Sequence, residues 1–183
     1  MRPAPAGTGI IFRRTDLPGT PEVPAKSTYI TNTLRATTLE QGPAKVFTVE
    51  HLLSALYAFH IDNCYLEMDS PEPPVADGGA LTFSRMILDA GTVEQEEMTD
   101  VLTLEKSLSV YEDGKFICAL PYKGLRITFT SINSHPLLGT QMRDILIDRD
   151  SYLKEIAPAR TIGFTWELDA LRKMGLGKGG TLE

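Results

Sequence analysis

The sequence predicts an α+β protein with two tandem two-layer α/β sandwich domains, each an antiparallel-rich sheet with helices packed on one face. Strand patterns followed by helix patterns occur twice along the 183 residues, and the later strands have the close spacing of hairpins. The acidic stretch Glu94–Asp100 separates the two sets. We therefore expect a first domain over residues 1–97 and a second over residues 98–183.

Three segments of the first half read as strands or turns. The apolar run Gly9–Phe12 predicts a short strand, and Leu17–Pro21 has the proline and glycine content of a turn. Threonines alternate with apolar residues over Tyr29–Leu39, which predicts a strand exposed on one face. Cys64–Met68 predicts a further strand.

Two helices complete the first half. The first is expected to begin after Thr48 as N-cap, because apolar residues then recur at helical spacing at Val49, Leu52, Leu53, Leu56 and Phe59. The second is expected over Leu81–Ala90, where Gly91 stops it.

The second half begins with strands and ends with helices. A turn at residues 112–114 joins the first two of its expected strands, which are Leu102–Val110, Phe116–Leu120 and Leu125–Ser131. The expected helices are Ser151–Glu155 and Trp166–Met174.

Composition excludes two classes of partner. The formal net charge of -6 provides no basic field for nucleic acid, and no apolar stretch approaches the roughly 20 residues that a membrane-spanning helix needs. The N-terminus has no apolar signal-peptide core. Cys64 and Cys118 lie in separate apolar runs, so we expect two buried free thiols and a cytoplasmic, reducing location.

The chemistry-bearing residues are Glu50 and His51, which point away from the apolar helix face beside small residues. In the first turn, the helix dipole favours an ionised Glu, as a general base requires, and a neutral His, as a metal requires. The spacing alone is more typical of a solvated surface pair than of a site. His60 is expected to be a partly buried or capping residue near the helix end, and His135 to lie in a turn.

Several ordered motifs resemble one enzyme family. They are residues 8–17, the Thr-Val-Glu-His-Leu-Leu segment at 48–53, Ile61-Asp62-Asn63, the Pro/Gly-rich segment 71–80, Ala159–Phe164 and Leu176–Gly180. Together they look like UDP-3-O-acyl-N-acetylglucosamine deacetylase, and they run along the whole chain. The glycine-rich segment Leu176–Gly180 lacks a phosphate-loop pattern, so a nucleotide cradle is not expected there.

The resemblance implies zinc-dependent removal of the N-acetyl group of UDP-3-O-acyl-N-acetylglucosamine in lipid A biosynthesis of Gram-negative bacteria. His51 would be a Zn²⁺ ligand and Glu50 the general base. Thr161 would help to hold the acyl or oxyanion group, and Phe164 would lie near the sugar and acyl path. A core aromatic is the competing interpretation of Phe164.

The resemblance also shows departures. The family's other two zinc ligands, a His and an Asp one helical turn apart, have no match here, nor has its opening hairpin with a Gly-Leu-His motif. We therefore expect a fragment with an incomplete second domain that is inactive alone. Gly79 stands where the family usually has serine. The competing function is a non-catalytic binding or remnant module that shares the fold.

Overall fold

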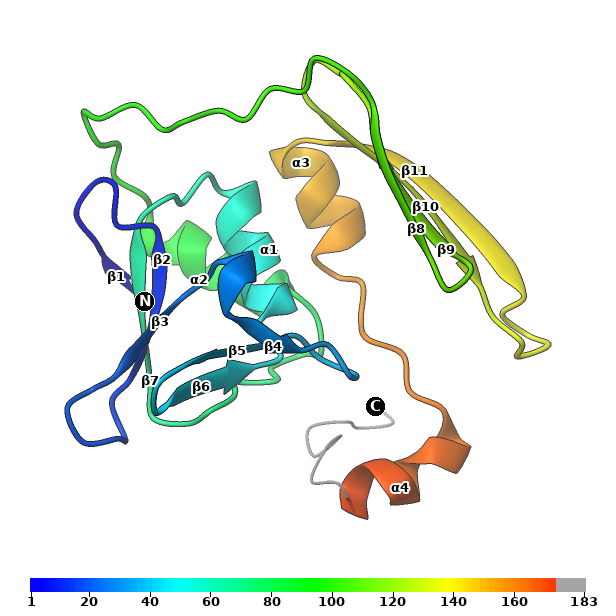
Figure 1. Ribbon diagram of the computed structural model, residues 1–183, viewed down its shortest axis with the longest axis horizontal. Coiled ribbons are helices and arrows are strands. Elements are labelled where there is room, and N and C mark those ends of the chain that lie inside the picture. The colour runs from blue at the N-terminus through cyan, green and yellow to red at the C-terminus, as the bar shows by residue number, and fades with distance from the viewer. Residues whose placement is uncertain (174–183) are drawn as a thin grey trace. The chain divides into compact units, whose positions relative to one another are not determined.

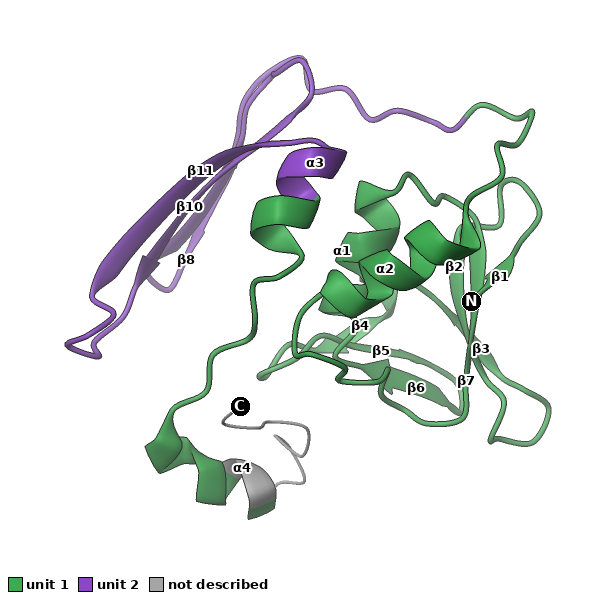
Figure 2. Cartoon of the chain, turned by 180° about the vertical axis from the view of Figure 1, so that it is seen from behind, with its two compact units in different colours: residues 1–98, 153–183 green, residues 99–152 purple. Residues whose placement is uncertain are grey.

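The computed structural model describes residues 1–173, so the segment Leu176–Gly180 and the predicted end of the last helix at Met174 lie outside the described residues. The protein is a mixed α/β chain with several small, mostly antiparallel sheets and few helices (Figure 1). By backbone contacts it divides into two compact units, coloured separately in Figure 2. Unit 1 comprises residues 1–98 together with the chain from Leu153 onward, and unit 2 comprises Thr99–Tyr152. The domain division at residues 97 and 98 stays a prediction.

Unit 1 contains two sheets. The first has the strand order β1-β7-β2-β3, in which only the β2–β7 pair is parallel, and the second has the order β4-β5-β6. Their bounds are β1 (Arg2–Pro3), β2 (Ile10–Arg14), β3 (Glu22–Pro24), β4 (Ile30–Asn32), β5 (Thr38–Gln41), β6 (Ala44–Phe47) and β7 (Cys64–Met68).

Two helices contribute to the core of unit 1. Helix α1 (Glu50–Ala58) packs against α2 (Leu81–Ala90), and the largest fully buried side chains include Phe12, Val23 and Leu56. Gly91 ends α2 with a φ of 74°, a left-handed conformation that glycine adopts without steric cost. The short turn η1 (Ser27–Tyr29) precedes β4, and η3 (Thr165–Glu167) leads into α4 (Leu168–Lys173).

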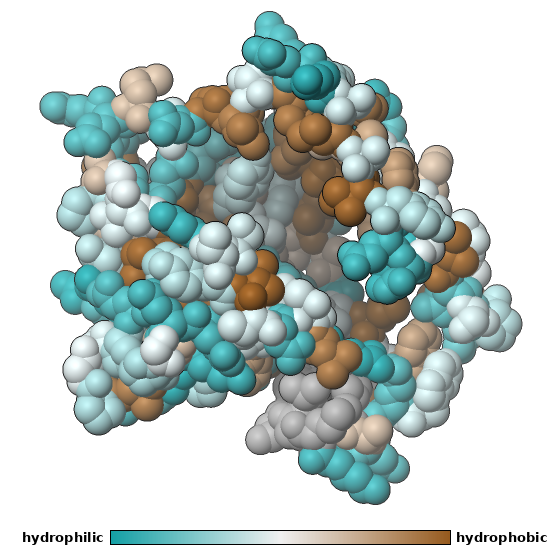
Figure 3. Space-filling view, in the orientation of Figure 1, coloured by the Kyte–Doolittle hydropathy of each residue, from teal (hydrophilic) through white to brown (hydrophobic). Residues whose placement is uncertain are grey.

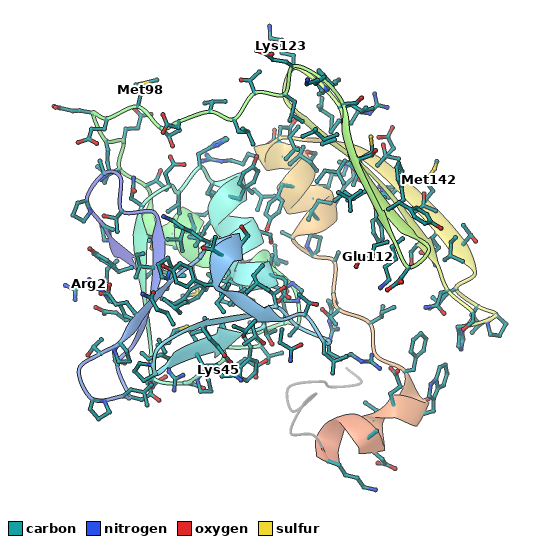
Figure 4. The ribbon with its side chains drawn as sticks, in the orientation of Figure 1. Arg2, Lys45, Met98, Glu112, Lys123 and Met142 are labelled. Carbon is teal, nitrogen blue, oxygen red and sulfur yellow. The ribbon has the colours of Figure 1, made fainter. Side chains whose placement is uncertain are left out.

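One buried arginine links the two sheets of unit 1. Arg14 at the end of β2 donates from Nε and Nη2 to the carboxylate of Asp16 at 2.8 and 2.7 Å. Its Nη1 donates at 2.6 Å to the carbonyl oxygen of Lys45 on β6, a residue labelled in Figure 4. The hydrogen bonds from Arg14 lower the pKa of Asp16, so this carboxylate stays charged at neutral pH.

Unit 2 consists of two hairpins and a short helix. The strands β8 (Leu108–Glu112) and β9 (Lys115–Ala119) form one hairpin, and β10 (Leu125–Ile132) and β11 (Thr140–Ile147) form the other. Both residues of the first turn, Asp113 and Gly114, have positive φ, as a tight hairpin turn requires. Asp148 caps α3 (Arg149–Ser151), and η2 (Tyr152–Ile156) continues the chain as a π-helical turn.

Hydrophobic side chains on these hairpins are exposed, and hydrophobic residues are visible at the molecular surface in Figure 3. They include Tyr111, Phe116, Phe129 and Met142, the last of which is labelled in Figure 4. Another is Ile117, which directly precedes Cys118 on β9. Cys118 itself is exposed, so the expectation of a buried thiol there was wrong, whereas Cys64 is buried and burial raises the pKa of its thiol.

Three predictions for the first half need correction. Thr48 is not the N-cap of α1, because its φ of 57° is left-handed and the helix begins at Glu50. The strand expected over Tyr29–Leu39 is broken at residues 33–37 into β4 and β5. His60 is exposed rather than partly buried, although its amide does donate to the carbonyl of Tyr57 at the end of α1.

In the second half, the strand expected over Leu102–Val110 is confined to β8, which begins at Leu108. Three short strands of the first half and β11 were not predicted. His135 begins a turn as expected, because the amide of Leu138 donates to its carbonyl oxygen. No helix among residues 1–173 is long and apolar enough to cross a bilayer.

Candidate functional site

Glu50 and His51 occupy the first turn of α1, as the sequence predicts. The helix begins there because the chain leaves β6 through the left-handed Thr48 and then buries Val49 and Leu52. Glu50 is exposed and His51 is half-buried. The hydroxyl of Ser54 donates to the carbonyl oxygen of His51 at 2.9 Å, so the side chain one turn along folds back onto the backbone of His51.

The side chain of His51 is held by Thr161. The Nε2 atom of His51 lies 3.0 Å from the Oγ1 atom of Thr161, a residue 110 positions further along the chain. This contact brings together two of the four predicted site residues. Nε2 is also a nitrogen through which an imidazole can bind a metal, and it would do so in place of this hydrogen bond, because the atom has a single proton or lone pair to share.

Glu50 is held by a different segment. The backbone N–H of Thr37, in the break between β4 and β5, donates to Oε1 of Glu50. No sequence pattern pointed to this partner, because residues 29–39 read as one continuous strand. The hydrogen bond occupies one carboxylate oxygen, and an exposed carboxylate has a second oxygen that can accept from a water molecule.

Thr161 is positioned through its backbone and through that of the preceding residues. Its N–H donates to the carbonyl oxygen of Gly78 at 3.0 Å, and the N–H of Ala80 donates to the carbonyl oxygen of Ala157 at 3.0 Å. A Cβ atom on Gly79 would lie 2.8 Å from the carbonyl oxygen of Ala159. The glycine at this position therefore coincides with a close approach of two backbone segments.

Phe164 belongs to an aromatic pair. Its ring stacks on that of Trp166, with centroids 4.4 Å apart and an angle of 11° between the planes. Phe164 is half-buried and Trp166 is exposed, so the pair is not part of the buried core of unit 1. This arrangement counts against the interpretation of Phe164 as a core aromatic.

An ion pair follows the aromatic pair directly. Arg35 donates from Nη2 to Oε1 of Glu167 at 2.6 Å and from Nη1 to Oε2 at 3.4 Å. Hydrogen bonding to Arg35 lowers the pKa of Glu167, and the same contact raises the pKa of Arg35. Sequence reasoning singled out neither residue.

The described residues do not complete a metal site. Within residues 1–173 there is no group of three or more His, Cys, Asp or Glu side chains that could hold a metal ion. His60 and His135, the remaining histidines, therefore do not join His51 in such a group. His51 has the donor chemistry of one zinc ligand, and the rest of a three-ligand set is not found among these residues.

Comparison with known proteins adds a strong likeness. The family model described as "LpxC: UDP-3-O-acyl N-acetylglycosamine deacetylase" matches residues 1–183. Curated proteins named UDP-3-O-acyl-N-acetylglucosamine deacetylase match the whole chain: 43% identity in Legionella pneumophila (strain Corby), 40% in Myxococcus xanthus and 38% in Acidithiobacillus ferrooxidans. The chain spans 61% of the Legionella protein and 58% of the Myxococcus protein.

Proposed function

The chain belongs to the UDP-3-O-acyl N-acetylglycosamine deacetylase family, and from that premise we propose that it contributes the general base and one zinc ligand to this hydrolysis. The substrate would be UDP-3-O-acyl-N-acetylglucosamine, and the reaction would remove its N-acetyl group in lipid A biosynthesis. The observation that carries the proposal is the pairing of His51 Nε2 with Thr161 Oγ1 beside Glu50, because it joins two family motifs far apart in sequence.

Each side chain would have one task. Glu50 would take a proton from the attacking water on a carboxylate oxygen, and the amide of Thr37 would fix the direction of that carboxylate. The Thr161 hydroxyl would donate a hydrogen bond to the oxyanion that forms on the acetyl carbonyl, which stabilises the developing charge. Phe164 would contact the sugar or acyl chain through its exposed stack with Trp166.

The proposed cofactor is Zn²⁺, with His51 as one ligand. When bound, zinc acidifies a water molecule and polarises the carbonyl of the scissile amide. Because the described residues contain no three-ligand cluster, we propose that the 183-residue chain alone does not turn over substrate.

The finer architecture is part of the same proposal. We infer two tandem two-layer α/β domains over residues 1–97 and 98–183, the second incomplete. Supporting it in the first half, Leu52 of α1, Leu66 of β7 and Phe83 of α2 border one cavity of about 200 Å³, so both helices lie close to the sheet there. The proposed location is the cytoplasm, with no nucleic-acid partner.

A chimaera tests the proposed function. The 185-residue matching segment of the Legionella relative would be replaced by this chain, and deacetylation of UDP-3-O-acyl-N-acetylglucosamine would be measured. We expect activity, and we expect Glu50→Gln to lower kcat by about 10²- to 10⁴-fold, the usual contribution of a general base. Glutamine keeps the acceptor for the Thr37 amide, so the fold should not change.

His51 and a matched histidine provide the control. His51→Ala should lower both zinc content and activity of the chimaera, whereas His60→Ala, at an exposed position two residues beyond the end of the same helix, should lower neither. A folded chimaera in which Glu50→Gln retains full activity would refute the assignment of the base.

A further inference from the structure

The two partners of the Glu50–His51 pair come from two separate segments. Thr37 belongs to the break between β4 and β5, and Thr161 to the extended segment that follows Ala157. Neither segment is part of α1, so the direction of each side chain depends on where its partner segment lies. Backbone hydrogen bonds tie the Thr161 segment to the turn before α2, and a side-chain contact ties it to the Thr37 segment.

The ion pair between Arg35 and Glu167 joins these segments. Arg35 lies two residues before Thr37, and Glu167 lies six residues after Thr161. The two terminal guanidinium nitrogens of Arg35 contact the carboxylate, at 2.6 and 3.4 Å, across 132 positions of sequence. A two-point contact between planar groups fixes orientation as well as distance.

Local backbone structure holds the arginine in this position. Arg35 has a φ of 66°, a left-handed conformation that is rare for residues with a side chain. The preceding amide, that of Leu34, donates to Oδ1 of Asn32 at 2.7 Å and tightens the same turn. On the other side, the N–H of Glu167 donates to the carbonyl oxygen of Phe164 at 2.9 Å.

We propose that Arg35 and Glu167 are positioning residues, a clasp whose ion pair sets the placement of Thr37 and Thr161 and through them the directions of Glu50 and His51. Its importance for catalysis rests on the proposed function. The arginine side chain is 50% exposed, and ion pairs of this kind add little to folding stability, so the clasp acts on local geometry and not on the fold.

The test uses the 183-residue chain labelled with ¹⁵N, without metal or substrate. Arg35→Glu and Glu167→Arg should each accelerate hydrogen exchange of the Thr37 amide by about tenfold or more, because local opening becomes easier. Each should also shift the His51 ring nitrogen signal that reports the contact with Thr161. The double variant Arg35→Glu/Glu167→Arg restores an ion pair of opposite polarity and should return both signals toward those of the unsubstituted chain.

Arg2→Glu is the matched control. It removes an exposed ion pair of unit 1, that between Arg2 and Glu67 at 3.2 Å, by the same change of charge. It should leave the Thr37 amide and the His51 ring unchanged. If a charge reversal lowers the melting temperature substantially, Arg35→Gln and Glu167→Gln provide the same comparison without introducing repulsion.

Unchanged Thr37 and His51 signals in the single variants, or a double variant that resembles the singles, would overturn the clasp. These outcomes are separate from the failure of the proposed function. An inactive chimaera would contradict the proposed function but not the effect of the ion pair on the Thr37 and His51 signals of the metal-free chain. Unchanged signals would contradict the clasp but not the deacetylase activity.

Discussion

Adjacent residues can depend on distant parts of the chain for their orientation. Glu50 and His51 are neighbours in the first turn of α1, yet Glu50 accepts from Thr37 and His51 contacts Thr161. The helical pattern of the sequence predicted the place of the pair, and only the family resemblance pointed to Thr161. Thr37 had no distinguishing signal, since a backbone amide is present at almost every position.

Arg14 is a buried arginine, and we expect its loss to cost more stability than the loss of an exposed arginine of unit 1. Arg14→Met would leave the carbonyl oxygen of Lys45 without this donor and Asp16 without its charge partner. We expect the free energy of unfolding in urea to fall by about 1–3 kcal/mol, because part-buried hydrogen bonds from a charged group are lost.

The neighbouring Arg13→Met is the control for that measurement. Arg13 is more exposed and pairs with Glu22 at 2.7 Å while its guanidinium lies over the ring of Tyr65. Its replacement should cost clearly less, because water can solvate the groups it leaves. An equal loss in both variants would contradict the role assigned to Arg14.

Two single-residue predictions failed for reasons that lie in the backbone and in packing. Thr48 has the composition of an N-cap, but its left-handed φ moves the helix start to Glu50, and no side-chain cap is formed. Cys118 lies in an apolar run, yet the hairpin of β8 and β9 exposes every residue of that strand. Neither the left-handed backbone of Thr48 nor the exposure of Cys118 can be inferred from the residues adjacent to it in the sequence.

At the scale of elements, Gly79 belongs to the turn that precedes α2 and lies close to the backbone of residues 157–159. Gly79→Ala would place a Cβ about 2.8 Å from the carbonyl oxygen of Ala159. We expect a loss of about 1–3 kcal/mol in the free energy of unfolding, typical of overpacking, together with a changed His51 ring signal as Thr161 moves. Differential scanning calorimetry and NMR measure the two effects.

Gly163→Ala is the matched control in the same part of the chain. A Cβ there would meet no atom within 4 Å, and no left-handed φ is involved. It should leave both the melting temperature and the ring signal close to their original values. If Gly79→Ala changed the melting temperature and the ring signal as little as Gly163→Ala does, the prediction would be wrong. A small shift of residues 157–161 would then accommodate a side chain at this position, such as the serine that is usual in the family.

The hairpin of β10 and β11 should depend on pH in the acid range. Arg126 and Thr128 donate to Asp144, and these bonds lower the pKa of Asp144 from 3.8 to about 2. A depressed pKa contributes stability above pH 3.8 that is lost as the pH falls toward 2.

Titration of the Asp144 carboxyl carbon by NMR between pH 5 and pH 1.5 measures this effect. Asp144→Asn should remove the pH dependence of the β10–β11 chemical shifts in that range. The chemical shifts around Asp148 should be the same in both proteins and serve as the reference, since Asp148 caps α3 independently. A midpoint for Asp144 near 3.8 would show that the cross-strand bonds do not form.

Elements with a local stop signal were predictable, and those defined by distant pairing were not. Helix α2 ends at Ala90 as expected, because Gly91 supplies the left-handed residue. Strand β11 was missed because Arg143 and Asp144 interrupt its apolar pattern, although Asp144 is paired across the hairpin. Strand β6 was missed because four residues are too few to show alternation.

At the scale of the whole molecule, the number of clustered metal-binding side chains limits how tightly the chain can bind zinc. The described residues offer no group of three metal-binding side chains, and the printed sequence holds three histidines. After dialysis against metal-free buffer, elemental analysis should find far less than one zinc per chain, and His51→Ala should not change that value. Stoichiometric zinc with deacetylase turnover in the 183-residue chain would contradict this prediction.

The family could be predicted from the sequence because its motifs run along the whole chain, and the match over residues 1–183 confirms it. The site was predictable only in part. Sequence motifs predicted four site residues, which are Glu50, His51, Thr161 and Phe164. Only tertiary contacts bring three further residues to the site, which are Thr37, Arg35 and Glu167. Those contacts depend on turns whose left-handed residues, such as Arg35, have no compositional signature.

The stacked aromatic pair has a practical consequence for spectroscopy. Trp166 is the single tryptophan of the chain, and it is adjacent to Glu167. Fluorescence excited selectively at indole wavelengths therefore reports on one short segment next to Thr161, without background from other tryptophans. Because Trp166 is 64% exposed and its ring is stacked on that of Phe164, its emission wavelength and its collisional quenching would report any rearrangement of this segment in real time.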